Sequence, residues 1–367
     1  MKRAILIAVS DLVFDQRVNR TATALAEVGF KVLMVGRKLP STPKWSPNGF
    51  RTFHLRVPFR KSAAFYACFN LQVFFFLLFS RFNIAQANDL DTLLGVRLAC
   101  FIRRKPLVYD SHELYTELPE LVSRPRTRTI WQWLERKLVK GLKHTTTVSE
   151  GVANELKKMY GITFTVVRNL PLKKKLNAEI AKQPNTIIYQ GALNLGRGLE
   201  KLIAAMQFLS NFKLIIAGTG DVEGELKQLS ESLNLSERIT FLGRITPNKL
   251  HPITCAASIG VSIEEDYGLN YRYALPNKLF DYIQAGLPVL VSNLPEMARI
   301  VTDYNIGLTI SSSSTATELA ENISQMLIDE SKLAQWQSNV AKAANELVWE
   351  NEKGKLVTIF QNAIKRK

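Results

Sequence analysis

A segment led by proline in the second half of the chain combines a helix start with a cation and a carboxylate. Residues 276–281 read Pro-Asn-Lys-Leu-Phe-Asp. Proline suits the start of a helix, and the first turn then offers free N–H groups and the positive end of the helix dipole. Lys278, between Asn277 and Leu279, adds a full charge, so this helix start suits a diphosphate. Asp281 lies on the same side and can accept hydrogen bonds from ribose hydroxyls. An ordinary capped helix with a surface Lys–Asp pair is the alternative.

A glycine-rich turn lies upstream of this segment. Residues 189–200 read Tyr-Gln-Gly-Ala-Leu-Asn-Leu-Gly-Arg-Gly-Leu-Glu. Gly191, Gly196 and Gly198 let the backbone approach a ligand closely. Arg197 can bind phosphate oxygens in a bidentate fork. The alternative is a strand-to-helix turn that needs glycine only for its geometry.

A third glycine cluster, Gly218-Thr219-Gly220, follows a strand-like run. It lacks the third glycine of a dinucleotide fingerprint, because Glu223 occupies that position. We interpret it as a tight turn and do not expect NAD binding. The three cysteines are far apart and no Cys/His cluster is present, so a zinc site is not expected either. No cofactor and no metal are predicted.

His112 is the main candidate in the first half of the chain. It follows the short run Leu107–Tyr109, at the carboxyl end of a predicted strand, and can donate a hydrogen bond to a sugar hydroxyl or a phosphate. A structural histidine is the alternative. The first strand-to-helix turn carries three further candidates for the acceptor side of the site, Asp15, Arg17 and Arg20. The alternative is that they belong to a solvated helix start.

Strand-like runs alternate with helix-like stretches throughout, which is typical of parallel sheets. We expect an α/β protein with two doubly wound, Rossmann-like domains facing a cleft. The expected domains are residues 1–170, joined by a C-terminal helix at 350–367, and residues 185–349, with a linker at 171–184. The predicted strands are Arg3–Val9, Lys31–Gly36, Ile84–Asn88, Leu107–Tyr109, His144–Val148 and Phe164–Arg168, then Thr186–Gln190, Lys213–Ala217, Ile239–Leu242, Ser258–Ile263, Val289–Ser292 and Gly307–Ile310.

An apolar segment and an excess of basic residues both fall in the first half. Residues 63–79 form an apolar run flanked by Arg60, Lys61 and Arg81. It is at the lower limit for spanning a bilayer, so a helix lying in the membrane interface or a core helix is favoured over a span. Residues 1–180 carry 30 Lys and Arg against 13 Asp and Glu, whereas the rest is close to neutral. This charge favours an anionic membrane surface, with solubility as the alternative.

We expect no export signal at the start of the sequence, because the apolar run after Met1 is short and closed by Asp11. A cytoplasmic protein is expected, peripheral on the inner face of the cell membrane. Nucleic-acid binding is not expected, because the basic residues are not set in a known motif.

These motifs resemble glycosyltransferase family 4, on the two-domain GT-B fold. The resemblance covers nearly the whole chain and rests on Gly191–Gly198, Phe241–Arg244, Pro276–Ser292 and Tyr109–Leu114. It implies retaining, metal-independent transfer from a nucleoside-diphosphate sugar. It also implies that the C-terminal domain holds the nucleotide, that the N-terminal domain holds the acceptor and that the last helix crosses back to the first domain.

By position, the resemblance assigns Arg197 to the diphosphate, Asp281 to the ribose and His112 to the transferred sugar. Leu242, Gly243 and Arg244 match the segment that contacts the base. Three departures stand out: Ala192 replaces the arginine usual after the first glycine, Asp281 replaces glutamate, and Tyr273 stands where the first glutamate of the Glu-x7-Glu motif belongs. Glu265 resembles that glutamate at a longer spacing.

The sequence therefore predicts a hexosyltransferase-type enzyme acting on a membrane-associated saccharide or a lipid-linked acceptor, as in surface polysaccharide synthesis. In the expected mechanism Arg197, Lys278 and the helix start stabilise the departing diphosphate, and His112 orients the sugar. A nucleotide-sugar epimerase of the same fold and a non-catalytic nucleotide-sugar-binding protein on a membrane surface remain alternatives. The base, the sugar and the acceptor are not encoded in recognisable motifs.

Overall fold

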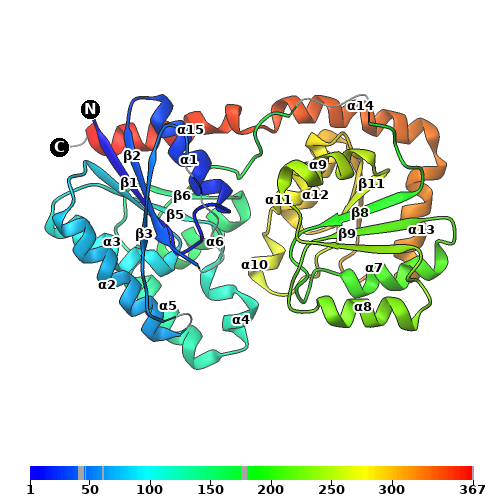
Figure 1. The fold of residues 1–367 in the computed structure, drawn as a ribbon, viewed down its shortest axis with the longest axis horizontal. Coiled ribbons are helices and arrows are strands. Elements are labelled where there is room, and N and C mark those ends of the chain that lie inside the picture. The colour runs from blue at the N-terminus through cyan, green and yellow to red at the C-terminus, as the bar shows by residue number, and fades with distance from the viewer. Residues whose placement is uncertain (40–44, 46, 60–61, 175–179, 366–367) are drawn as a thin grey trace. The chain divides into compact units, whose positions relative to one another are not determined.

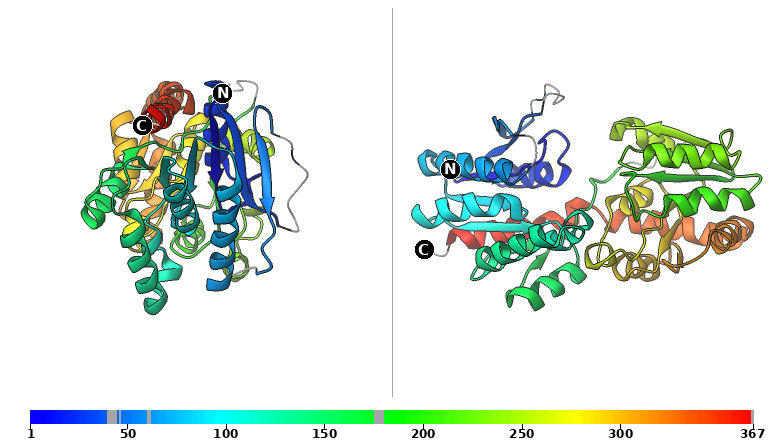
Figure 2. Two further views of the ribbon diagram at one scale, coloured as in Figure 1. Left: turned by 90° about the vertical axis from the view of Figure 1, so that its left-hand side faces the viewer. Right: turned by 90° about the horizontal axis from the view of Figure 1, so that it is seen from below.

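The structure is a computed structural model that describes residues 1–39, 45, 47–59, 62–174 and 180–365. The chain forms two compact units. Unit 1 contains residues 1–169 and 350–367, and unit 2 contains residues 170–349. Each unit is built around its own parallel sheet, as Figures 1 and 2 show. The expected α/β class with two doubly wound sheets is confirmed.

Unit 1 is a seven-stranded sheet in the order β3-β2-β1-β4-β5-β6-β7, with parallel pairing throughout. Chain order reverses between β1 and β4, so the crossover helices α1 and α3 lie on opposite faces of the sheet. The strands are β1 Arg3–Ile7, β2 Lys31–Arg37, β3 Arg51–Leu55, β4 Ile84–Asn88, β5 Leu107–Ser111, β6 Thr145–Thr147 and β7 Thr165–Val166. The helices are α1 Gln16–Glu27, α2 Ala63–Phe79, α3 Leu90–Ile102, η1 Tyr115–Glu117, α4 Pro119–Val122, α5 Pro125–Val139, α6 Glu150–Tyr160 and α15 Trp349–Lys365.

The last helix returns to unit 1, as expected. Arg168 N donates a hydrogen bond to Glu352 Oε1 at 2.9 Å, and Lys353 Nζ lies 2.6 Å from a Glu27 carboxylate oxygen. The Phe360 ring packs edge-on against Phe30, with centroids 6.4 Å apart. These contacts fasten α15 beside α1 (Figure 1).

Helix α2 coincides with the apolar run 63–79 and has two different faces. Phe65, Phe69, Asn70, Val73 and Leu77 are buried, and Asn70 Nδ2 donates to Asp91 O, which joins α2 to α3. Leu71, Phe75 and Phe79 are exposed. The flanking residues Arg60 and Lys61 lie outside the described residues. Among the helices of the described residues, none is long and apolar enough to cross a membrane.

Unit 2 is a six-stranded parallel sheet in the order β10-β9-β8-β11-β12-β13. Here chain order reverses between β8 and β11. The strands are β8 Thr186–Gln190, β9 Lys213–Ala217, β10 Ile239–Gly243, β11 Ile259–Ser262, β12 Val289–Ser292 and β13 Gly307–Ile310. The helices are α7 Leu199–Ala205, η2 Met206–Phe208, α8 Glu223–Ser232, α9 Pro247–Ala256, α10 Leu269–Arg272, α11 Asn277–Gln284, α12 Pro295–Tyr304, α13 Ala316–Ile328 and α14 Glu330–Glu346.

Strand β3 and the predicted linker bear on the boundaries of the elements. Strand β3 was not predicted, because its residues alternate between polar and apolar and most remain accessible at the sheet edge. Residues 171–184 were predicted as the interdomain linker, and in the described residues of this segment main-chain groups bond to unit 2. Lys174 N donates to Gln284 Oε1 at 3.0 Å, and Gln183 N donates to Ala256 O at 2.7 Å. Residues 175–179 lie outside the described part.

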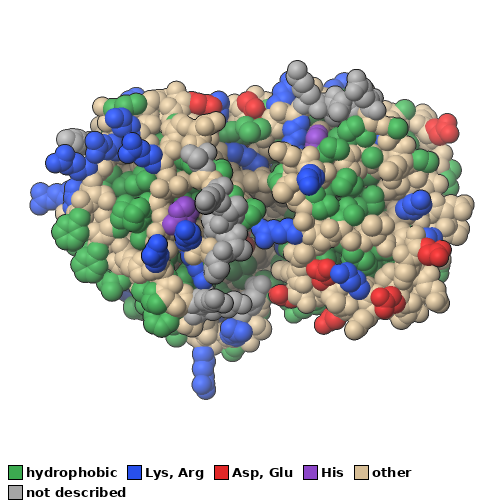
Figure 3. All heavy atoms as spheres, viewed as in Figure 1, with side chains coloured by type: hydrophobic (Ala, Val, Ile, Leu, Met, Phe, Trp, Pro, Cys, Tyr) green, Lys and Arg blue, Asp and Glu red, His purple; other side chains and the backbone are tan. Residues whose placement is uncertain are grey.

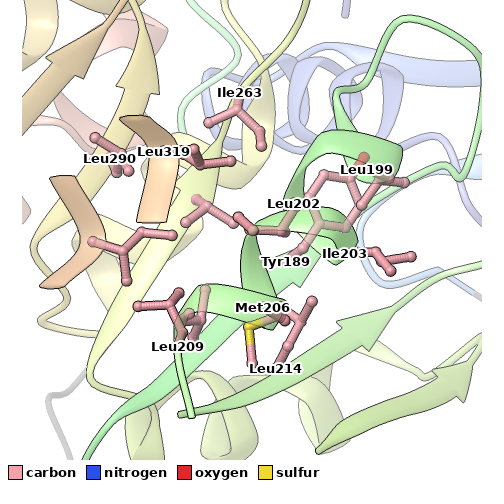
Figure 4. Close-up of a cluster of buried hydrophobic side chains, with 14 of the residues drawn as sticks. Tyr189, Leu199, Leu202, Ile203, Met206, Leu209, Leu214, Ile263, Leu290 and Leu319 are labelled. Carbon is pink, nitrogen blue, oxygen red and sulfur yellow. The ribbon is translucent and has the colours of Figure 1, made fainter. Parts of the chain in front are cut away.

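The glycine turns of unit 2 sit on its hydrophobic core, part of which Figure 4 shows. Tyr189, Leu199, Leu202 and Ile203 are fully buried there, so the turn between β8 and α7 is anchored on both sides. Gly218 has φ +151°, and a Cβ there would stand 1.8 Å from Gly191 O. The glycines after β9 therefore allow this turn to pack closely against the turn after β8. This agrees with the interpretation of the cluster as a tight turn.

This packing predicts that Gly218→Ala destabilises unit 2 by about 2–4 kcal/mol, because the new Cβ meets a main-chain oxygen in a strained conformation. Gly224→Ala in α8 is the matched control: a Cβ there meets nothing within 4 Å. It should change stability by less than about 1 kcal/mol, in the stabilising direction. Urea titration with hydrogen exchange read on β8 and β9 peptides measures both. Equal midpoints for the two variants would contradict the packing account.

Candidate functional site

The candidate site of unit 2 lies at the carboxyl ends of β8 and β11, where the chain order of the sheet reverses. Ligands of open parallel sheets bind at such a switch point. The glycine turn 191–198 follows β8, and Glu264 follows β11. A main-chain hydrogen bond of 2.9 Å from Glu265 N to Gly196 O joins the two loops.

Arg197 and Lys278 come from different elements and meet at one carboxylate. Arg197 precedes α7, and Lys278 is the second residue of α11. Lys278 Nζ lies 2.7 Å from Glu264 Oε1, and Arg197 Nη1 lies 3.5 Å from the same oxygen. The sequence predicted that these two cations act together, and the structure places them side by side.

Aromatic rings hold both cations in place. Lys278 Nζ lies 3.9 Å from the centroid of the Tyr189 ring, and the Arg197 guanidinium carbon lies 4.9 Å from the centroid of Tyr271. Cations are attracted to the faces of such rings, and more strongly when water is excluded. Lys278 is 7% exposed, whereas the Arg197 side chain is 26% exposed. Arg197 is therefore the more accessible of the two cations.

Glu264 is the fixed anion of the site. It is fully buried, and Ser262 Oγ donates a hydrogen bond of 2.8 Å to its Oε2. Burial opposes its ionisation, but the charges of Lys278 and Arg197 outweigh burial and hold the pKa of Glu264 below its usual value. The group therefore stays ionised at neutral pH and keeps both cations oriented.

The two cations retain hydrogen-bonding capacity for a ligand. Although Lys278 Nζ lies close to Glu264, it makes no hydrogen bond of regular geometry with any residue that the structure describes. Arg197 Nε is likewise buried without a partner among those residues. Unpaired buried donors are costly, so such groups call for an acceptor. Two positive charges face one negative charge at Glu264, which leaves the cluster net cationic and suited to an anion.

The remaining residues of the proline-led segment have separate roles. Asp281 Oδ2 accepts a 3.1 Å hydrogen bond from Gln190 Nε2, which holds this half-buried carboxylate beside the glycine turn. Asn277 is exposed at the helix start. Leu279 was predicted to contact the donor, but its side chain is fully buried in the core, so only its main chain can serve a ligand.

Leu242, Gly243 and Arg244 lie at the end of the edge strand β10. Gly243 O accepts a 2.9 Å hydrogen bond from Gly218 N, and Gly218 packs on Gly191. The segment expected to contact the base is thus continuous with the glycine turn. Glu265 is half-buried on the β11 loop, while its neighbour Glu264 makes the contacts with the two cations.

Unit 1 holds a second buried cluster of charges, centred on Asp110 at the end of β5. Arg17 donates to both carboxylate oxygens of Asp110, at 2.8 and 2.7 Å, and to Val167 O at 2.8 Å. Arg17 is only 5% exposed. The sequence predicted Arg17 on the acceptor side. In the structure Asp110 and the main-chain carbonyl of Val167 accept hydrogen bonds from its guanidinium.

His112 is held between two carboxylates. Its Nδ1 lies 3.0 Å from Asp89 Oδ2, and its Nε2 lies 3.1 Å from Asp110 Oδ2. Burial by itself lowers the pKa, but the two carboxylates outweigh it and hold the pKa of His112 well above its ordinary value of 6.5. Both ring nitrogens therefore carry protons, and His112 is a fixed cation that cannot act as a base at neutral pH.

Asp15 and Arg20 have local partners. Asp15 caps α1 by accepting a 3.0 Å hydrogen bond from Val18 N. Arg20 Nη1 donates to Asn169 Oδ1 at 2.8 Å and so ties α1 to the end of unit 1.

Sequence reasoning missed Glu264, Asp89 and Asp110. Asp110 and His112 are two residues apart along an extended run, so they face the same side, and this spacing was a usable signal. Glu264 stands two residues beyond Ser262 in the same way. Asp89 offered no such signal, because it reaches His112 from the end of the neighbouring strand β4.

Two family models match the chain. The model described as Glycosyl transferases group 1 matches residues 173–343, and the model described as Glycosyltransferase Family 4 matches residues 16–170. The first match covers most of unit 2, and the second covers most of unit 1. Together they include both candidate sites.

Curated relatives match over parts of the chain. An uncharacterized glycosyltransferase of Methanocaldococcus jannaschii is 29% identical over 142 residues, which is 36% of this chain and 34% of that protein. The O-antigen chain mannosyltransferase RfbU of Salmonella typhimurium is 23% identical over 206 residues, covering 54% of this chain and 56% of RfbU. The chain thus spans between a third and just over half of the length of these relatives.

Solved structures match over the full length. Sucrose-phosphate synthase from Thermosynechococcus elongatus superposes with a TM-score of 0.78 at 18% identity, with all of both chains covered. Anabaena HepE in complex with UDP-glucose gives a TM-score of 0.74 at 15% identity, covering 99% of this chain and 100% of HepE. At these identities the likeness shows the fold, which is the two-domain GT-B fold.

The geometry around His112 predicts an imidazolium that persists above neutral pH. Nitrogen-15 NMR of the ring should show both nitrogens protonated at pH 7.5, and a titration centred near 6.5 would refute the ion-pair cluster. Because the folded pKa is raised, the stabilisation is complete below pH 6.5 and is lost as pH rises through the folded value. The stability advantage of the wild type over His112→Asn should therefore be larger at pH 6 than at pH 10.

Proposed function

Because the chain belongs to the group 1 and family 4 glycosyltransferases, we propose that unit 2 binds a nucleoside-diphosphate sugar and that the protein transfers its sugar to an acceptor. The observation that carries this proposal is the meeting of Arg197 and Lys278 at Glu264. A diphosphate needs several hydrogen-bond donors and a net positive charge in one place. These two side chains, with the first turn of α11, supply both.

The donor is proposed to lie along the carboxyl edge of β10, β9, β8 and β11. Its diphosphate would contact Arg197 and Lys278, and Asp281 would accept hydrogen bonds from the ribose. The main chain of residues 242–244 would contact the base. The structure of HepE with UDP-glucose supports a uridine nucleotide as the first donor to test.

The chemical step we propose is a substitution at the anomeric carbon of the sugar. The bond from this carbon to the diphosphate oxygen breaks, and a bond to the acceptor hydroxyl oxygen forms. Negative charge grows on the leaving phosphate, where Arg197 and Lys278 stabilise it. The acceptor proton passes to that phosphate oxygen, so no side-chain base is required. From the family resemblance we also propose that the reaction needs no metal ion. Retention of configuration follows from transfer on the same face, and the family resemblance supports it.

His112 has a narrower role in this proposal than the sequence indicated. As an imidazolium between Asp89 and Asp110 it cannot accept a proton, so general-base catalysis is not assigned to it. We propose that its fixed positive charge orients the sugar and favours the developing negative charge.

The proposed acceptor is a membrane-associated saccharide or a lipid-linked sugar of a surface polysaccharide. The partial match to the mannosyltransferase RfbU supports this class. The basic charge of the first half of the chain is compatible with an acceptor that carries phosphate.

Replacing either cation should abolish most of the transfer. Removing one donor that stabilises a developing anion costs about 2.7–4 kcal/mol, so Arg197→Ala and Lys278→Ala should each lower kcat by about a hundredfold to a thousandfold. Lys332→Ala is the matched control, since Lys332 also pairs with an acidic residue, at 3.6 Å, but at an exposed position of α14. Donor consumption with a disaccharide-lipid acceptor is measured after circular dichroism has verified folding.

Nucleoside diphosphates are first screened by thermal unfolding, because the ligand that raises Tm most identifies the base. Unchanged turnover in both cation variants would remove the proposed mechanism. Donor conversion without any acceptor would instead indicate an epimerase.

A further inference from the structure

The amino edge of the unit 1 sheet contains a pocket of about 670 Å³. The starts of β1, β2 and β3 line it, together with the two residues that follow α2. Each of these four segments contributes a basic side chain: Arg3, Lys31, Arg51 and Arg81. No acidic residue is among those that line the pocket. The pocket is therefore a concave surface of one charge sign.

The four basic side chains are exposed, and within the described part of the chain none pairs with a carboxylate. They are therefore free to bind an anion from solvent. Their convergence in a pocket distinguishes them from scattered surface lysines, because a phosphate group can contact several of them at once.

An apolar surface adjoins this pocket. Leu71, Phe75 and Phe79 are four residues apart on α2 and so form one exposed stripe. Leu98, Phe101 and Ile102 are exposed at the end of α3, which packs on α2. Phe79 and Phe101 are 81% and 82% exposed. We call these six residues the apolar stripe.

The ends of α2 and α3 hold the apolar stripe next to the basic pocket. Phe79 directly precedes Ser80 and Arg81 of the pocket. Arg103, after α3, donates a hydrogen bond to Leu78 O, and its guanidinium lies 5.8 Å from the centroid of the Phe82 ring. Figure 3 shows Lys and Arg side chains next to hydrophobic ones over the end of unit 1 that carries the N-terminus.

The charge distribution favours the same partner. Unit 1 has 32 Lys and Arg residues against 14 Asp and Glu, a net charge of +18, whereas unit 2 has a net charge of −2. An exposed apolar patch bordered by cations is typical of a protein surface that lies in a membrane interface. Anionic headgroups attract such a surface, and each basic residue near the headgroups adds to the attraction.

We propose that this edge of unit 1 docks on an anionic lipid bilayer, with the pocket of Arg3, Lys31, Arg51 and Arg81 holding the phosphate of a lipid headgroup and the apolar stripe entering the acyl boundary. The proposed surface lies at the opposite edge of the sheet from His112, so it is separate from the sugar-handling residues. It also does not depend on the donor site of unit 2. Its failure would leave the proposed transfer reaction untouched.

Vesicle sedimentation with the full chain tests the proposal. The wild type should bind vesicles of phosphatidylcholine with 30% phosphatidylglycerol and should bind pure phosphatidylcholine at least tenfold more weakly. Arg51→Gln with Arg81→Gln should weaken binding to the anionic vesicles by tenfold or more. The matched control is Arg124→Gln with Arg126→Gln, which removes the same charge from exposed positions before and at the start of α5. It should weaken binding by less than threefold.

A second variant separates a membrane from free phosphate as the ligand. Phe79→Ser with Phe101→Ser should weaken vesicle binding by tenfold or more, because insertion of the two rings is lost. All substituted side chains are exposed, and unchanged thermal unfolding and nucleoside-diphosphate binding verify the fold. Wild-type vesicle binding by the Phe variant would overturn the proposal, and so would equal losses in the two arginine pairs or no preference for phosphatidylglycerol.

Discussion

A carboxylate that is buried away from water needs a positively charged partner. In unit 2 this requirement fixes the positions of two cations. Glu264 is fully buried, and Lys278 and Arg197 reach it from α11 and from the glycine turn. Removing one partner of such a pair costs about 3–5 kcal/mol, so the cations cannot easily move away. The fold therefore holds the donors of an anion site in place before any ligand arrives, which lowers the cost of reorganisation during reaction.

In unit 1 a buried carboxylate also holds two cations, but these cations are left with less capacity to bind a ligand. Asp110 is fully buried, and Arg17, Thr146 and His112 all contact its carboxylate. Here the cations are satisfied: Arg17 has no accessible donor left, and His112 is bound on both ring nitrogens. Two carboxylates balance these two cations of unit 1, whereas in unit 2 Arg197 and Lys278 share the single carboxylate of Glu264. The excess of positive charge is why the anion site is assigned to unit 2.

Sequence patterns predicted the framework well because buried parallel strands are short continuous apolar runs, as in β1 and β12. They missed β3, an edge strand whose alternating residues remain accessible. Arg197 and Lys278 could be predicted because a glycine-rich turn and a helix start are both recognisable from neighbouring residues in the sequence. Glu264 was missed, and the burial of Arg17 was not foreseen, because pairing between distant segments leaves no local pattern. The positively charged state of His112 depends on Asp89, which only the fold brings near.

The central claim is that Arg197 and Lys278 bind the diphosphate of the donor. Calorimetric titration of the full chain with a nucleoside and with its diphosphate measures this directly, since the two ligands differ only in the diphosphate. The diphosphate should bind at least about a hundredfold more tightly, equivalent to about 2.7 kcal/mol from two charged contacts. Equal affinities for the two ligands would show that the cations do not contact the phosphates and would contradict the account.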